Sequence, residues 1–142
     1  MTYRDSSAPD RSLLVIGLNG RVIGIDRNTG ARRFEHDIGG RSEVELAILD
    51  NRIFATTGRP LYCFEYPTGK LLGTAAIPGS YTGRPTMLID GRHLILATRG
   101  EVACFDDQGH LLWFDPLPGR GVGSVALGFP NNVRQADDIG SE

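Results

Sequence analysis

The segment VIGIDRNTG (22–30) has two relatives further along the chain, LYCFEYPTG (61–69) and VACFDDQG (102–109). Their closing glycines are 39 and 40 residues apart. Each segment begins with β-branched or aromatic residues and ends in a triplet suited to a hairpin turn, because glycine adopts positive φ at low cost. A chain of 142 residues that repeats itself three times at this spacing predicts a repeat architecture.

Other strand-like runs surround each of these segments. A run ending in glycine precedes each one: SLLVIGLNG (12–20), NRIFATTGR (51–59) and RHLILATRG (92–100). Another run follows each glycine: ARRFEHDI (31–38), KLLGTAAI (70–77) and HLLWFDPL (110–117). After a Gly-rich loop comes an apolar run: VELAILD (44–50), PTMLIDG (85–91) and SVALGFP (124–130). Naming the apolar run strand A and the next three B, C and D, the unit is four strands in about forty residues. This predicts an all-β fold, a β-propeller of four-stranded antiparallel blades.

The hairpins GIDRNTGARRF, CFEYPTGKLLG and CFDDQGHLLW resemble the quinoprotein-type, or PQQ-like, β-propeller repeat. That repeat has an acidic residue shortly before Thr-Gly and a tryptophan after it. The acidic position here holds Asp26, Glu65 and Asp106, and the tryptophan position holds Phe34, Gly73 and Trp113. The resemblance covers residues 12 to about 130 and implies a propeller scaffold.

The same resemblance bears on activity. Quinoprotein dehydrogenases bind a quinone and calcium and carry adjacent cysteines against the cofactor, whereas Cys63 and Cys104 lie 41 positions apart. The resemblance therefore supports the scaffold and speaks against the cofactor. Other proteins with this repeat are non-enzymatic binding platforms, and we expect this chain to be one of them. The two cysteines are expected to be buried and inert between blades.

The strands predict three blades that are cut out of phase. The first repeat (about 12–40) begins at strand B, the second (41–81) and third (82–121) have all four strands, and a terminal strand A (122–130) follows. A disordered polar lead (1–11) and a flexible acidic tail (134–142) are expected to frame them, and the start methionine and polar ends favour a complete chain. Three blades are too few for a ring of about 4 to 8. We therefore predict a strand-exchanged homodimer of six blades, in which the last strand of each chain pairs with the first of the other. The alternatives are a fragment of a longer propeller and blades supplied by another protein.

Composition and motifs exclude several functions. A net charge of −2 gives no overall attraction to nucleic acid, and no basic and aromatic platform for stacking bases is visible. No apolar run approaches the roughly 20 residues that span a bilayer, and no export signal is seen, so we expect a cytoplasmic protein. The histidines are isolated, and GRGVGSVALG (119–128) precedes a strand rather than the helix that a phosphate loop needs. We predict no catalytic, cofactor-binding or metal-binding residue, and no enzyme activity.

One constellation predicts a binding surface. In a propeller the B–C and D–A loops emerge on the same face, which we call the loop face. Six arginines lie in these loops and would make twelve around one mouth of the dimer: Arg21, Arg41, Arg59, Arg84, Arg99 and Arg120. Such a ring predicts a protein partner with an acidic or anionic surface. The alternative is that these are solvated charges partly neutralised by Glu43, Glu45 and Glu101. Two other functions stay open, a small-ligand or cofactor-binding propeller and a structural subunit of a larger assembly.

Overall fold

The structure is a computed structural model that describes residues 10–39 and 43–136, so most of the expected lead and tail lies outside it. The described residues form strands, turns and loops and no helix. In chain order the strands are β1 (Leu13–Leu18), β2 (Arg21–Asp26), β3 (Arg32–Asp37), β4 (Glu45–Leu49), β5 (Arg52–Thr56), β6 (Leu61–Glu65), β7 (Leu71–Ala75), β8 (Thr86–Asp90), β9 (His93–Thr98), β10 (Glu101–Asp106), β11 (Leu111–Asp115), β12 (Leu127–Phe129) and β13 (Asn132–Arg134).

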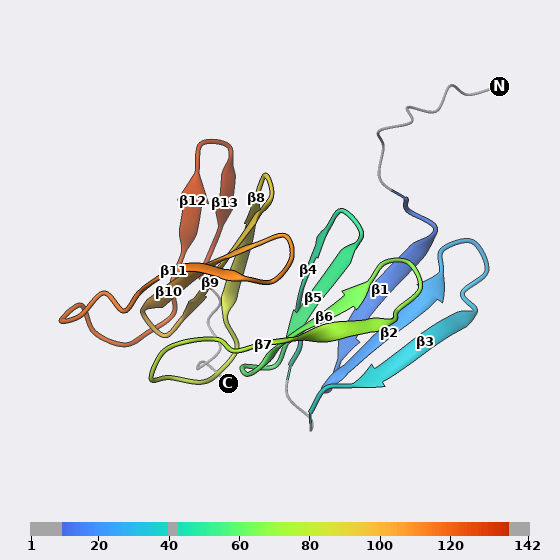
Figure 1. Cartoon of the computed structure of the whole chain (residues 1–142), viewed down its shortest axis with the longest axis horizontal. Helices are drawn as coiled ribbons and strands as arrows, with labels where there is room; N and C mark the ends of the chain where they lie inside the picture. Colours follow the sequence, from blue (N-terminus) through green and yellow to red (C-terminus); the bar gives the residue numbers. More distant parts are fainter. Residues whose placement is uncertain (1–9, 40–42, 137–142) are drawn as a thin grey trace.

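The strands form antiparallel sheets in the predicted order. The first sheet has three strands, β1-β2-β3, and the second and third have four each, β4 to β7 and β8 to β11. Figure 1 shows the three sheets side by side, with β1 to β3 at one end and the β12–β13 hairpin at the other. The innermost strands β4, β8 and β12 contact one another in succession, as the first strands of consecutive blades do. The all-β fold of repeated antiparallel sheets is confirmed.

The C-terminal segment differs from the expectation of a lone strand. After β12 the chain turns at Asn131, which has a φ of +61°, and returns as β13. Leu127 pairs with Arg134 and Phe129 with Asn132 in this short hairpin. The segment PNN (130–132) supplies turn residues, since asparagine tolerates positive φ. By its place in the repeat, β13 is the beginning of a strand B.

The core lies between the sheets and buries β5 and β6 of the second sheet on both faces. Ile53 and Phe64 pack in a cluster shared with the first sheet, and Phe54 packs in one shared with the third. All three side chains are at most 1% exposed. Successive residues of a strand point to opposite faces, so Ile53 and Phe54 serve different interfaces. Full burial of each side chain stabilises the fold by about 1.5–3 kcal/mol.

The acidic residue of each repeat organises the turn that joins its last two strands. Oδ1 of Asp26 accepts hydrogen bonds from the backbone amides of Asn28 and Thr29, at 2.8 and 3.1 Å. The amide of Asn28 contributes most to lowering the pKa of Asp26, followed by the Arg33 side chain, 3.1 Å away. The motif that carries the family resemblance is therefore a turn-stabilising device.

The third repeat uses the same device with different partners. Burial raises the pKa of Asp106, but the amides of His110 and Gln108 and the ring of His110 donate to the carboxylate and leave the pKa lowered. Both amide distances are 2.9 Å. The turns of the first and third repeats are thus both held by ionised carboxylates.

These shifts predict a pH-dependent stability. Because the folded pKa values lie below the ordinary 3.8, the ionised carboxylates stabilise the fold above that pH, and the contribution is lost as pH falls through the folded values. We expect D26N/D106N to lower the melting temperature near neutral pH, and the difference from wild type to shrink below about pH 4. Thermal unfolding followed by circular dichroism across this range measures it. A difference that stays constant with pH would show that charge plays no part.

Candidate functional site

Three of the loops that carry the predicted arginines, those of Arg59, Arg84 and Arg99, contact one another. The D–A loop 76–85 bridges two B–C loops. Arg59 donates to the carbonyls of Gly79 and Tyr81, at 2.5 and 3.0 Å, and Arg99 donates to the carbonyl of Thr82 at 3.1 Å. Glu101, which is 8% exposed, accepts from the amide of Ser80 at 2.8 Å. These bonds tie the loops of neighbouring blades into one surface.

Arg84 is neutralised by carboxylates. It lies 2.6 Å from Glu43 and 2.6 Å from Glu45, and its side chain is only 21% exposed. Glu45, at the start of β4, also forms an ion pair with Arg134 of β13 at 3.2 Å. This cluster links β4, the loop before β8 and the C-terminal hairpin. Arg84 therefore holds the inner strands together and offers little charge to a partner.

The other predicted arginines within the described residues, Arg21, Arg59, Arg99 and Arg120, are exposed. Arg21 is exposed and lies 3.5 Å from Glu35, and Arg120 donates to the carbonyl of Pro118 at 2.6 Å. Arg41 lies outside the described residues. Within the described chain, Arg59, Arg99 and Arg120 have no carboxylate within ion-pair distance. These three keep a charge that an anionic partner could meet.

The junction between the first two sheets shows how blades pack. The ring of Phe34 lies between Gly24 of its own sheet and Gly69 of the next sheet's hairpin turn, and it leaves no room for a side chain at either glycine. Nε2 of the neighbouring His36 lies 2.6 Å from the carbonyl oxygen of Gly69. An aromatic ring on the turn glycine of the next blade is thus one of the contacts that join these sheets, beside the apolar cluster of Ile53 and Phe64.

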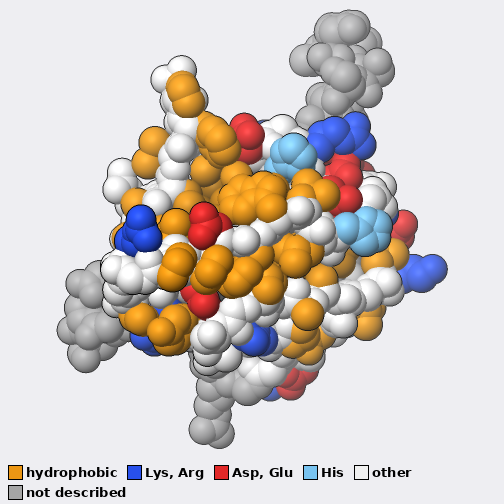
Figure 2. Space-filling view, turned by 60° about the vertical axis from the view of Figure 1, so that its left-hand side comes forward, with side chains coloured by type: hydrophobic (Ala, Val, Ile, Leu, Met, Phe, Trp, Pro, Cys, Tyr) orange, Lys and Arg blue, Asp and Glu red, His pale blue; other side chains and the backbone are white. Residues whose placement is uncertain are grey.

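The two end sheets expose surfaces that the inner junctions bury. Leu14 pairs with Ile25 as Ile53 pairs with Phe64, so Leu14 and Ile53 occupy equivalent positions. Ile53 is 0% exposed, whereas Leu14 is 53% exposed. At the other end, Trp113 has the register position of Phe34 and is 49% exposed. Figure 2 shows hydrophobic side chains gathered in a broad band on the face that includes the end of the molecule with β11 to β13.

A hollow lies beside the free edge of β1. Its volume is about 590 Å³, and its lining includes Leu14, Ile25 and Gly30 of the first sheet and Ile48 of β4. The first sheet lacks a fourth strand, and β1 pairs only with β2. The hollow therefore lies on the side where a strand A would complete the blade.

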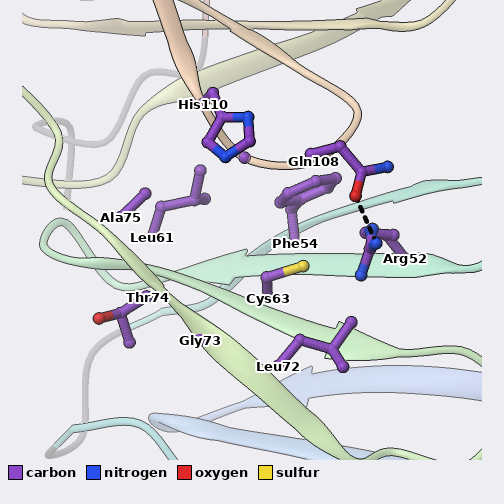
Figure 3. A pocket seen from close by; sticks show the side chains of 11 residues that line it. Arg52, Phe54, Leu61, Cys63, Leu72, Gly73, Thr74, Ala75, Gln108 and His110 are labelled. Carbon is purple, nitrogen blue, oxygen red and sulfur yellow. Dashed lines mark hydrogen bonds between the residues drawn. The ribbon is translucent and has the colours of Figure 1, made fainter.

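A second pocket, of about 420 Å³, lies between the second sheet and the turn 108–110 of the third (Figure 3). Gly73, at the tryptophan position, lines it and has open space where a side chain would stand. Cys63 also lines it, and both cysteines are free and buried, as expected. Burial raises the pKa of Cys63, and the charge of Arg52 opposes this rise. Sequence reasoning missed this pocket, although glycine at the tryptophan position was the available signal.

Residues 10–39 and 43–136 contain no group of three or more histidines, cysteines and carboxylates placed to hold a metal ion. Nor do they form any helix that is long and apolar enough to cross a membrane.

Comparison with solved structures places the fold. The computationally designed propeller Ika8 matches 86% of this chain at a TM-score of 0.66 and 24% identity. The designed Ika4 matches 84% at 0.63 and 24% identity. BamB from Moraxella catarrhalis, a PQQ-like β-propeller repeat protein, matches 73% at 0.57 and 22% identity. The chain has a β-propeller-like fold.

The extent of these matches differs among the three structures. The present chain spans 38% of the Ika8 chain and 33% of the BamB chain, but 75% of the Ika4 chain. No protein-family model and no curated protein matches the sequence. At these identities the likeness concerns the fold alone.

The packing of Phe34 predicts a difference between equivalent turn glycines. Gly69 and Gly109 both have positive φ, +78° and +86°, so alanine strains the backbone at either position. Only at Gly69 would the added methyl group also collide with the ring of Phe34. We expect G69A to lower the free energy of unfolding by about 1–3 kcal/mol more than G109A. Chemical denaturation of the two variants measures this, and equal losses would mean that the ring does not constrain the junction.

Proposed function

We propose that two copies of this chain form a six-bladed ring that acts as a non-enzymatic, cytoplasmic scaffold for protein interaction. The observation that carries the proposal is the pair of complementary end surfaces. Trp113 holds the position from which Phe34 covers Gly69, and Gly30, the equivalent turn glycine at the other end, has open space above it. Placing the third sheet of one copy against the first sheet of another repeats the internal junction at the seam. Two-fold symmetry then closes both seams with one contact.

The strand edges are consistent with the same arrangement. β12 follows β4 and β8 as the next innermost strand, and β1 is the free strand B of a blade that lacks its strand A. In the ring, β12 of one copy pairs with β1 of the other, which has six residues. In the single chain the partner of β12 is β13, which has only three residues, and Val133 of this strand is 60% exposed. The longer strand replaces the shorter one, so strand exchange requires β13 to leave β12.

The dimer predicts that the end surfaces control the oligomeric state. Wild type should have a mass in solution of twice 15.4 kDa. L14E and W113A should shift it toward the monomer, because each removes apolar contact from the seam, and G30A should do the same by filling the space under the tryptophan. The matched controls are L71E, at a leucine 50% exposed on the middle sheet, and G109A. Light scattering after gel filtration gives the masses, and a wild-type monomer at micromolar concentration would overturn the ring.

The loop face is the proposed contact with a partner. Arg59 and Arg99 project from B–C loops that are hydrogen-bonded to loop 76–85, and Arg120 donates to the carbonyl of Pro118 within its own loop. None of the three pairs with a carboxylate of the described residues. A fixed loop loses little conformational freedom on binding, which favours association. An acidic or anionic protein surface is the partner that these charges would attract.

This contact predicts a selective effect of charge reversal. R59E/R99E should weaken binding of a polyglutamate peptide roughly tenfold at low salt, since each exposed ion pair contributes about 0.2–1 kcal/mol and reversal adds repulsion. R32E/R92E makes the same change in net charge at arginines whose side chains are 76% and 78% exposed, and should have a smaller effect. Fluorescence anisotropy of the labelled peptide measures both. Equal losses in the two variants would reduce the effect to net charge and remove the loop face as the site.

A further inference from the structure

The pocket between the second and third sheets exists because one aromatic side chain is missing from the repeat. At the preceding junction the ring of Phe34 fills the space between two glycines. The same register position in the second sheet is Gly73, which pairs with Cys63 as Phe34 pairs with Gly24. The turn that such a ring would cover contains Gly109, and this glycine lines the pocket. The pocket thus lies where the fold normally places an aromatic ring.

The walls of the pocket suit an aromatic ring. Phe54, Leu61, Leu72 and Ala75 are apolar members of the lining. Figure 3 shows Phe54 and Leu61 of the second sheet next to Gln108 and His110 on the turn above. A planar ring between these walls would bury apolar area on both of its faces, as Phe34 does at the other junction.

Arg52 adds a charge to one side of the pocket. Its Nη2 donates to Oε1 of Gln108 at 2.6 Å, across the two sheets. Its Nε is buried and has no oxygen or nitrogen acceptor within the part of the chain that the structure describes, and the Arg52 side chain neighbours the thiol of Cys63. No carboxylate of those residues forms an ion pair with Arg52. A buried donor without an acceptor is unfavourable, and a guanidinium can donate two parallel hydrogen bonds to a carboxylate.

We propose that this pocket binds a small aromatic carboxylate. The ring occupies the space above Gly73, and the carboxylate meets the guanidinium of Arg52 beside Gln108. The site lies within a single chain, so it is independent of the proposed dimer and of the loop face. It also differs from a site in the central pore, because it is formed by the outer part of two adjacent blades.

Two related compounds provide the test. Indole-3-acetate has the ring and the carboxylate, and indole has the ring alone. Isothermal titration should show indole-3-acetate binding at least tenfold more tightly than indole. R52Q, which keeps a polar side chain of similar reach, should remove this difference while leaving indole binding unchanged. Failure of indole-3-acetate to bind at millimolar concentration, or an unchanged preference in R52Q, would overturn the proposal.

A filled pocket and a chemical label give independent readouts. G73F restores the aromatic ring of the repeat and should abolish binding of both compounds, and circular dichroism checks that the variant folds. In the wild type, indole-3-acetate should slow alkylation of Cys63 by iodoacetamide at least threefold. Cys104 is the internal control, because it does not line this pocket. Equal protection of the two cysteines, or none, would place the ligand elsewhere or exclude it.

Discussion

The contact of an aromatic ring with the turn glycine of the next sheet is the constraint that sets the junction between the first two sheets and makes the two ends of the chain complementary. Phe34 can pack on Gly69 only because that residue has no side chain. The positive φ of the turn also favours glycine at this position. The acidic residue fixes the equivalent turns of the first and third repeats through backbone amides, as Asp26 and Asp106 show. In the turn of Gly69 itself, Glu65 accepts a hydrogen bond from the hydroxyl of Thr68 at 2.6 Å. The acidic residue and the glycine thus shape the turn, and the aromatic ring packs on it.

The contact is directional, because the ring lies on one side of a blade and the turn glycine on the opposite side. The first sheet contributes the ring of Phe34 to the next blade, whereas the second sheet has Gly73 at that position and contributes no ring. The last sheet of this chain ends with an unused ring, Trp113, and the first sheet begins with an unused turn glycine, Gly30. Exposure of a tryptophan at 49% and of Leu14 at 53% is unfavourable in water. The two ends of the chain are complementary in the same way as the facing surfaces of the first two sheets. This is the physical basis for proposing that a second copy of the chain covers them.

The sequence was sufficient to predict features that repeat and insufficient for those that occur once. The period near forty and the alternation of turns and strands predicted the sheets, and the cysteine positions predicted buried thiols between blades. The sequence did not predict β13, because three residues that follow a proline resemble a polar tail unless the turn at Asn131 is recognised. Which arginines are paired with carboxylates also depends on tertiary contacts. Arg84 is 41 positions from Glu43 and 39 from Glu45, so no local sequence pattern predicts that pairing.

The pocket beside Gly73 shows why an exception within a repeat can be informative. In one sequence, glycine at the tryptophan position only weakens the resemblance; with the sheets in place, it opens a space of about 420 Å³ at a junction that the first repeat closes. The same junction contains a buried Arg52 Nε without an acceptor, and an unsatisfied buried donor costs about 1–3 kcal/mol. Two unfavourable features, a lost ring and an unpaired donor, therefore coincide in one place within a fold that avoids both at its neighbouring junction. Departures from local consistency of this kind are expected where a protein binds something, because a ligand that supplies the ring and the anion satisfies both at once.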